Sequence, residues 1–398
     1  MTVLIQIHCI QNHSPANLNR DDIGAPKTCY FGGVLRSRIS SQCLKRSIRM
    51  SREFSSLLGG IRTRRLSSLV AAGLEGDTAL IKRADAVLKL CGVEPKKAPK
   101  PGAEDEDGGD STSKALVYTT RAAVQQIIEL VRATSREPAE EVAKQVAGII
   151  ATQVLAPDMA LSGRMLEPDS SAKATWAKLD TRIEASLQVA HAISTHEARP
   201  EVDYYVAADD APGSDAGAGF VDEALFGSAC FYKYFSVNWE ALQANLAGAG
   251  DRRAALAAHT VAALIRGAAL AQPTGKQNSF AAHNPPDGIL VELRDTPISY
   301  ANAFARPVEV AQRDITSQSV AQLACYAHDL DEGYGAPDAR AWFSPNLRFR
   351  LTADAGAAEQ EVAGENLRSL DALVAWVVER LGQRWEDVRQ VSLSPADL

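Results

Sequence analysis

Stretches in which apolar and polar residues alternate, with many Val, Ile and aromatic residues, predict strands at several points along the chain. They are residues 2–11, the middle of 183–195, and residues 200–206, 229–238 and 288–294. Residues 209–219, between two of these stretches, are rich in Gly, Asp, Pro and Ser, which favour turns. This pattern predicts a hairpin-like projection over roughly 196–224.

Apolar residues that recur every three or four positions predict helices in most of the remaining chain. The expected helices cover residues 61–92, 115–133, 138–155, 251–270, 315–329 and 366–381. The first three make the block 61–180 a mostly helical insertion. Residues 94–113 interrupt it with Pro, Gly and acidic residues that cannot build a core, so we expect a disordered loop there. Residues 12–30 and 272–287 are predicted loops.

This order of elements predicts an α+β protein, in which a sheet domain carries large insertions. The sheet domain would be formed by residues 1–60 and 183–398, and the helical insertion by 61–182. A ferredoxin-like, RRM-like core is an economical way to arrange such strands and helices.

Composition narrows the class of protein. Apolar residues make up 46 % of the 398 residues, which is ordinary for a globular protein. No apolar run reaches the length of a membrane helix, about 20 residues, and the first residues lack the basic region of a signal peptide. The six cysteines are scattered without a C-x-x-C pair, which favours reduced thiols over disulfides or zinc. We therefore expect a cytoplasmic protein that makes no membrane contact.

A basic helix is predicted directly after Ser40 and Ser41, whose hydroxyl groups can cap its first turn. Leu44 and Ile48 would anchor this helix to a core. A different face presents polar and basic side chains at spacings of three, four and three, namely Gln42, Lys45, Arg49 and Arg52. Together with the free amide groups at the start of a helix, this face suits a string of phosphates.

Charge is distributed very unevenly along the chain. From Arg20 to Arg65 there are eleven Lys or Arg and three Asp or Glu, a net charge of +8. The whole chain carries −7, so the remainder carries −15. Such polarisation favours binding of a polyanion by the basic segment. A solvated basic helix face is the open alternative, because short basic patches are weak motifs by themselves.

A series of motifs runs through most of the chain in one order. They are S-P-A-N-L-N-R-D-D (14–22), F-G-G (31–33), R-I-S-S-Q-C-L-K-R-S-I-R (38–49), A-L-S-G-R-M (160–165), A-H-A-I-S-T-H (190–196), V-D-Y-Y-V-A-A-D-D (202–210), K-Q-N-S-F-A-A-H-N-P (276–285) and S-Y-A-N-A-F (299–304). Together they resemble the CasC family, the backbone subunits of the type I-E CRISPR surveillance complex Cascade. The likeness is weaker in the helical insertion and in the last part of the chain.

The resemblance implies an RRM-like palm, helical fingers over 61–182 and a β-hairpin thumb over 196–224. It implies that several copies line a CRISPR RNA as a helical filament, kink it at fixed intervals and present it to target DNA in antiviral defence. Further implied partners are the large, small, repeat-processing and 5′-handle-capping subunits of Cascade and a recruited helicase–nuclease. The subunit itself is expected to have no cofactor and no catalytic activity.

The basic pattern and the resemblance together give a set of expected RNA-binding residues. They are Arg20, Lys27, Arg38, Ser40, Gln42, Lys45, Arg46, Arg49, Arg52, Arg164, Met165 and Lys276. Contacts to phosphates hold RNA without reading its sequence, which suits a protein that carries many different guides. Met165 matches the family position that wedges against a displaced base.

Two other functions stay open. Asp21 and Asp22 lie in a loop after the first strand, where related type III backbone subunits use an aspartate to cleave RNA. A metal-dependent ribonuclease would use one of them, and the alternative is that Asp22 holds the loop. A monomeric RRM-type protein would instead stack bases on aromatic side chains, although such residues are more often part of a core. The candidates are Tyr204, Tyr205, Phe231, Tyr232 and Tyr234.

Two motif-like pairs do not meet the requirements of a metal or nucleotide site. His191 and His196 with Glu197 lack the H-E-x-x-H spacing and a third ligand. Gly275-Lys276 lacks the upstream glycine and the following Ser or Thr of a phosphate-binding loop. We expect structural histidines and no metal site.

Overall fold

The computed structural model describes residues 2–92, 116–166, 172–207, 220–309, 314–354, 359–391 and 393. Two compact units make up the chain. Unit 1 comprises Met1–Ser55, Leu187–Glu240 and Ala258–Arg389, and unit 2 comprises Ser56–Ser186, Ala241–Ala257 and Gln390–Leu398. Residues 241–257 thus belong to unit 2, whereas the sequence pattern placed them in the sheet domain. The predicted disordered loop at 94–113 and the predicted hairpin tip at 209–219 lie outside the described residues.

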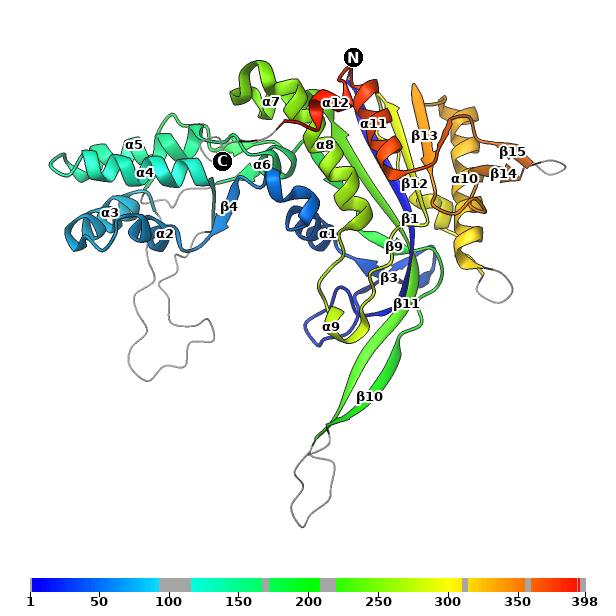
Figure 1. The fold of residues 1–398 in the computed structure, drawn as a ribbon. Helices are drawn as coiled ribbons and strands as arrows, with labels where there is room; N and C mark the ends of the chain where they lie inside the picture. The colour runs from blue at the N-terminus through cyan, green and yellow to red at the C-terminus, as the bar shows by residue number, and fades with distance from the viewer. Residues whose placement is uncertain are drawn as a thin grey trace, which may run out of the picture. The chain divides into compact units, whose positions relative to one another are not determined.

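Unit 1 is organised around a sheet of ten described strands (Figure 1). The main path runs β16 (Glu365–Leu367), β13 (Ala339–Phe343), β12 (Gly288–Arg294), β1 (Leu4–Ala16), β11 (Phe220–Asn238), β9 (Ala192–Ser194), β3 (Val34–Ile39) and β2 (Thr28–Phe31). Two further strands, β8 (Leu187–Val189) and β10 (Glu201–Ala207), also pair with β11. Neighbouring strands are antiparallel, except that β13 and β16 are parallel.

Both faces of the central strands are covered. On one face, Tyr232 packs with Val320 and Leu323 of α10 (Ile315–Tyr334). Phe231 points to the opposite face, because side chains alternate along a strand, and there it packs with Leu44 of α1 (Ser41–Arg49). Phe231, Tyr232 and Tyr234 are all buried, so the prediction that these aromatic residues belong to the core is confirmed.

The predicted hairpin is present in its described part. β10 pairs with the first part of β11, from Glu201 opposite Phe226 to Ala207 opposite Phe220. β11 is 19 residues long, and its second part pairs with β1 in the sheet. The hairpin is therefore a direct extension of a central strand, and Figure 1 shows it projecting beyond the sheet. Tyr204 and Tyr205 are exposed on it, so the prediction of a core position was wrong for these two residues.

The remaining elements of unit 1 are short or flank the sheet. They are η4 (Ala301–Phe304), α9 (Gln277–Phe280), β14 (Thr352–Asp354), β15 (Glu359–Glu361), α11 (Leu370–Arg380) and α12 (Trp385–Val388). Three elements contain residues of both units: η1 (Arg52–Leu57), α7 (Trp239–Asn245) and α8 (Arg253–Leu270). In the described ranges, no helix has both the length and the apolar composition needed to cross a membrane.

Unit 2 is mostly helical, as predicted. Its helices are α2 (Leu66–Gly73), α3 (Thr78–Leu90), α4 (Arg121–Ala133), α5 (Ala139–Thr152), α6 (Pro157–Ser162) and η3 (Ala247–Arg252), with short strands β4 (Gly60–Thr63), β5 (Val117–Thr120), β6 (Arg164–Met165) and β7 (Arg182–Ile183). The periodic apolar residues form its core, with Ile127 and Val131 of α4 against Val142 and Val146 of α5. The Asp77 carboxylate caps α3 by accepting from the amide groups of Ala79 and Leu80.

Several predicted boundaries were wrong. Residues 117–120, predicted to start a helix, form β5, since the β-branched and aromatic run V-Y-T-T favours a strand and pairs with β4. The predicted loop at 12–30 contains the end of β1 and most of β2. The strand β13 was not predicted, and β16 occupies the start of the predicted helix 366–381.

A buried ionic network joins β12, β13 and α10. The Glu292 carboxylate accepts hydrogen bonds from Arg340 Nε (2.6 Å), Arg294 Nε (2.9 Å) and the Tyr300 hydroxyl (2.8 Å). Asp331 of α10 accepts from Arg340 Nη1 (2.6 Å) and from Arg294 Nη2 (3.1 Å). Burial by itself raises the pKa of Glu292, but nearby positive charge outweighs it and keeps this pKa below its usual value. Every charge of this network is thus compensated locally.

Two buried histidines of β1 predict that stability depends on pH. Burial lowers the pKa of His8 to about 4 and that of His13 to about 3, whereas both would titrate near 6.5 in the unfolded chain. The unfolded state therefore binds more protons below pH 6.5, and stability is lost as the pH falls towards 4. We expect the free energy of unfolding to fall by about 1 kcal/mol per pH unit for each histidine between pH 6 and 5.

Denaturant unfolding at a series of pH values measures this slope. His13→Phe should reduce this slope by about 1 kcal/mol per pH unit, the contribution of one histidine. An unchanged slope in that variant would contradict the lowered pKa of His13.

Candidate nucleic-acid interface

Helix α1 starts where the sequence predicts. Ser40 Oγ accepts a hydrogen bond from the Cys43 amide (3.3 Å), and the Ser40 amide donates to Asn19 Oδ1 (2.8 Å). The predicted cap is thus confirmed, and it ties α1 to the loop that follows β1. Because Ser40 is buried and its hydroxyl group is engaged in the cap, its direct role is to position the helix.

The inner face of α1 is formed by Leu44 and Ile48, which are buried as predicted. Gly267 of α8 lies against Ile48, where a Cβ atom would come within 2.8 Å of the Ile48 side chain. This close approach fixes the helix on the body of unit 1. Lys45 and Arg49, one turn apart, consequently share a different face of α1.

The basic stripe is shorter than predicted. α1 ends at Arg49, and Met50 closes it by donating its amide hydrogen to the carbonyl groups of Arg46 and Ile48. Arg52 instead begins the 3-10 helix η1, so the prediction that it continues the stripe of α1 was wrong. Gln42 and Arg46 are exposed, whereas Lys45 and Arg49 are half-buried.

Lys27 and Arg38 come together beside α1. The Arg38 amide donates to the Lys27 carbonyl (2.8 Å), and both side chains line one hollow of unit 1. Arg38 Nη1 donates to His191 Nδ1 (2.8 Å). Burial and the charges of Arg38 and Lys27 lower the pKa of His191, which keeps this ring neutral and able to accept the hydrogen bond. The two cations thus form one site together with a neutral imidazole.

The loop between β1 and β2 carries Arg20, which is exposed and lies in a bridge with Pro26. Asp21 shapes this loop, because its Oδ1 atom accepts hydrogen bonds from the amides of Ile23 (3.1 Å) and Ala25 (2.9 Å). Both aspartates are exposed, and it is Asp21 rather than Asp22 that holds the loop.

Lys276 reaches the same region from the segment before β12. It has a left-handed backbone (φ 51°) just before α9, and Gly275 precedes it. A Cβ atom on Gly275 would lie 2.6 Å from the Leu18 carbonyl oxygen, so only glycine lets this segment lie against the loop after β1. Hydrogen bonds from the Glu223 amide and Tyr205 lower the pKa of Asp222 on the hairpin, and Lys276 contributes to the same shift. Lys276 therefore lies near both the loop and the hairpin.

Arg164 and Met165 belong to unit 2 and have different surroundings. The Arg164 guanidinium is buried and donates to the carbonyl groups of Ile150 (2.7 Å), Ala151 (3.2 Å) and Thr181 (3.2 Å). It therefore holds β6 in place. Met165 is 75 % exposed.

A hollow beside Met165 contains two further arginines that the sequence analysis did not single out. Arg62 and Arg182 line it, together with Tyr118. The Arg62 guanidinium lies over the Tyr118 ring at 4.4 Å from its centroid. These residues lie on two separate strand pairs, β4 with β5 and β6 with β7. Contacts such as the hydrogen bond from Arg62 to Ser162 join the two pairs across long stretches of chain, so sequence spacing carried no signal for them.

The structure thus defines an α+β protein with a ten-stranded sheet, a helical second unit and basic side chains gathered around α1 and the loop after β1. The sequence model of the family described as CT1975-like protein matches residues 5–376, and the chain belongs to this family.

Solved structures extend this relationship. The chain is similar to a chain of a "CRISPR RNA-guided surveillance complex, pre-nicking", with 28 % identity and a TM-score of 0.77 over 95 % of this chain and 100 % of that chain. A chain of a "CRISPR RNA-guided surveillance complex" has 24 % identity and a TM-score of 0.67 over 95 % of this chain and 99 % of that one, which supports the fold. No curated protein sequence matches significantly. The resemblance to CRISPR surveillance subunits is confirmed at this level.

Proposed function

We propose that this protein is a CRISPR RNA-binding backbone subunit of a type I-E Cascade complex. The observation that carries the proposal is the likeness to a surveillance-complex chain over 95 % of this chain and the whole of the other. The strand order β12–β1–β11–β9 gives further support, because with α1 and α8 it corresponds to the βαββαβ arrangement of an RRM-like palm.

In this proposal several copies line the guide RNA as a helical filament. Lys27 and Arg38, with Lys45 and Arg49 of α1, follow the phosphates and leave the bases unread. The β10–β11 hairpin acts as the thumb, and the exposed Met165 wedges against a displaced base at each kink. The segments between kinks remain available to target DNA.

The proposed subunit is a scaffold and not an enzyme. Asp21 uses its carboxylate to hold its own loop, which supports this role over RNA cleavage. The other Cascade subunits (large, small, repeat-processing and 5′-handle-capping) would complete the particle, and a separate helicase–nuclease would cut the target.

Purification with CRISPR RNA and the neighbouring subunits tests the proposal. The ratio of absorbance at 260 and 280 nm and the native mass should show several copies of this chain on one intact RNA. A single copy per RNA would favour a monomeric RRM-type protein. RNA cut at regular steps, with cleavage abolished by Asp22→Asn, would favour a ribonuclease. Protein free of RNA would reject the proposal.

A further inference from the structure

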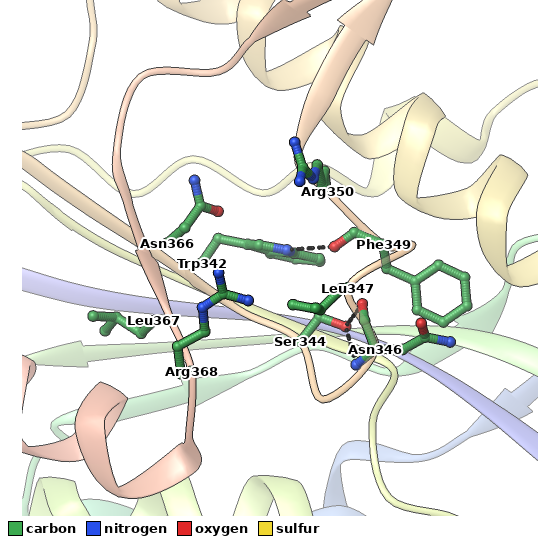
Figure 2. A pocket seen from close by; sticks show the side chains of 9 residues that line it. All are labelled: Trp342, Ser344, Asn346, Leu347, Phe349, Arg350, Asn366, Leu367 and Arg368. Atoms are coloured by element: carbon green, nitrogen blue, oxygen red, sulfur yellow. Dashed lines mark hydrogen bonds between the residues drawn. The ribbon is translucent and has the colours of Figure 1, made fainter.

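A pocket lies where β13 and β16 end (Figure 2), and none of the basic residues discussed above lines it. These two strands are parallel, so their carboxyl ends open on the same edge of the sheet. The floor is Trp342, whose indole N–H donates to the Phe349 carbonyl (2.9 Å). A Cβ atom on Gly288 of β12 would come within 2.0 Å of the Trp342 ring, so the ring is packed tightly onto its neighbour strand. The floor is therefore rigid.

Two arginines that border this pocket form no ion pair within the described part of the chain. Seven arginines lie between residues 338 and 391, and five of them form ion pairs. The pairs are Arg340 with Glu292 and Asp331, Arg348 with Asp314, Arg380 with Glu365, Arg384 with Asp387, and Arg389 with Glu386. The other two, Arg350 and Arg368, form no ion pair with any described residue, are exposed, and line the same pocket. In a chain of net charge −7, this arrangement indicates a binding site for an anion.

The neutral amide side chain of Asn346 accompanies the two cations. Asn346 Oδ1 accepts a hydrogen bond from the Arg348 amide (3.1 Å). This bond orients the Asn346 side chain, so that its NH2 group points away from the Arg348 amide. The Ser344 hydroxyl donates to the Asp287 carbonyl (2.6 Å) and accepts from the Asn346 amide (3.1 Å), so it fixes the turn that carries Asn346. Guanidinium groups form paired hydrogen bonds with a carboxylate or a phosphate. The pocket therefore offers what a compact, planar or tetrahedral oxyanion requires.

The surroundings favour a protein carboxylate over nucleic acid. Trp342 and Phe349 are buried, so neither ring offers a face on which a base could stack. Leu347, which is 65 % exposed, adds an apolar rim. A single acidic side chain with an aliphatic neighbour matches this combination.

We propose that the Arg350–Arg368 pocket binds an aspartate or glutamate side chain, flanked by an aliphatic residue, from a different protein subunit. The inference rests on the proposed function in one respect only, which is that the partner is expected to be another subunit of the same complex. It assigns to the far end of the sheet a protein contact that is separate from the RNA-binding surface.

The first experiment uses the full chain and a defined probe. The peptide acetyl-Leu-Glu-Leu-amide should bind the wild-type protein, and acetyl-Leu-Gln-Leu-amide should bind at least ten times more weakly. Arg350→Glu with Arg368→Glu should lose the Glu peptide. Arg306→Glu with Arg384→Glu is the matched control, since it makes the same charge change at two exposed arginines of unit 1 outside the pocket.

The second experiment uses the complex purified with its RNA and neighbouring subunits. Native mass spectrometry of the Arg350→Glu, Arg368→Glu complex should show at least a ten-fold loss of one other protein subunit, with the RNA and the copies of this chain unchanged. Loss of RNA instead would identify the pocket as a nucleic-acid site. A subunit composition equal to that of the control complex would show that the pocket does not hold a neighbouring subunit. Either result would overturn the proposal.

Failure of the proposed function can be distinguished from failure of the proposed carboxylate site. If the wild-type chain carries no RNA but distinguishes the two peptides through Arg350 and Arg368, the proposed function fails and the carboxylate site stands. If it does not distinguish the peptides, the carboxylate site is wrong, whatever the RNA content.

Discussion

Replacing Lys45 and Arg49 together by glutamate should weaken binding of the CRISPR RNA on the order of 100-fold at physiological salt. The two side chains lie one turn apart on α1, so the exchange turns one face of the helix from attractive to repulsive for phosphates. The slope of log affinity against log salt concentration should also become smaller by about 1.4, because each contact to a single strand contributes about 0.7. Filter binding at several NaCl concentrations measures both quantities.

The Arg306→Glu, Arg384→Glu protein makes the same change in net charge at arginines outside the proposed RNA surface and should keep both affinity and slope near wild type. If the α1 variant matches this control, α1 does not follow the RNA backbone and the proposed interface must lie elsewhere.

Replacing Arg340 by methionine should destabilise unit 1 by about 3–5 kcal/mol, because it leaves the buried Glu292 and the half-buried Asp331 with less compensating charge. The midpoint of thermal unfolding should fall on the order of 10 °C. Differential scanning calorimetry of the purified chain measures this shift.

Arg348→Met provides the comparison, since Arg348 pairs with Asp314 at the surface and its loss should cost less than about 1 kcal/mol. Equal effects of the two substitutions would show that the buried network adds no stability beyond that of a surface ion pair.

Features that depend on local sequence were predictable. The Ser40 cap and the buried Leu44 and Ile48 follow from residue types within one short helix, and the structure has all three. The core of unit 2 was predictable for the same reason, because apolar residues that recur every three or four positions in α4 and α5 form the faces through which these helices pack. In both cases the contacts that decide the structure lie a few residues apart in the chain.

Roles that depend on distant contacts were not predictable. Arg164 and Arg38 look alike in the sequence, yet Arg164 is buried against backbone carbonyl groups while Arg38 lines an open hollow. Arg36, two residues before Arg38, is also buried and donates to the Ser194 and Phe304 carbonyls. The residues next to an arginine in the sequence do not show whether it will donate hydrogen bonds to carbonyl groups 14 or 268 residues away. The strand β13 was missed for the same reason, since its five residues are defined by pairing with β12.

The pairing of β1 has a consequence for how the protein is made. Leu4 lies opposite Asn238 on one side and opposite Arg294 on the other. At ribosomal rates of about 5–20 residues per second, this strand waits roughly 10–60 s for its partners. The helices α2 to α5 pack on one another within residues 66–152 and can form much earlier. During synthesis, then, β1 emerges well before either of its partner strands, and it has to be shielded from non-native pairing until residues 288–294 have been made.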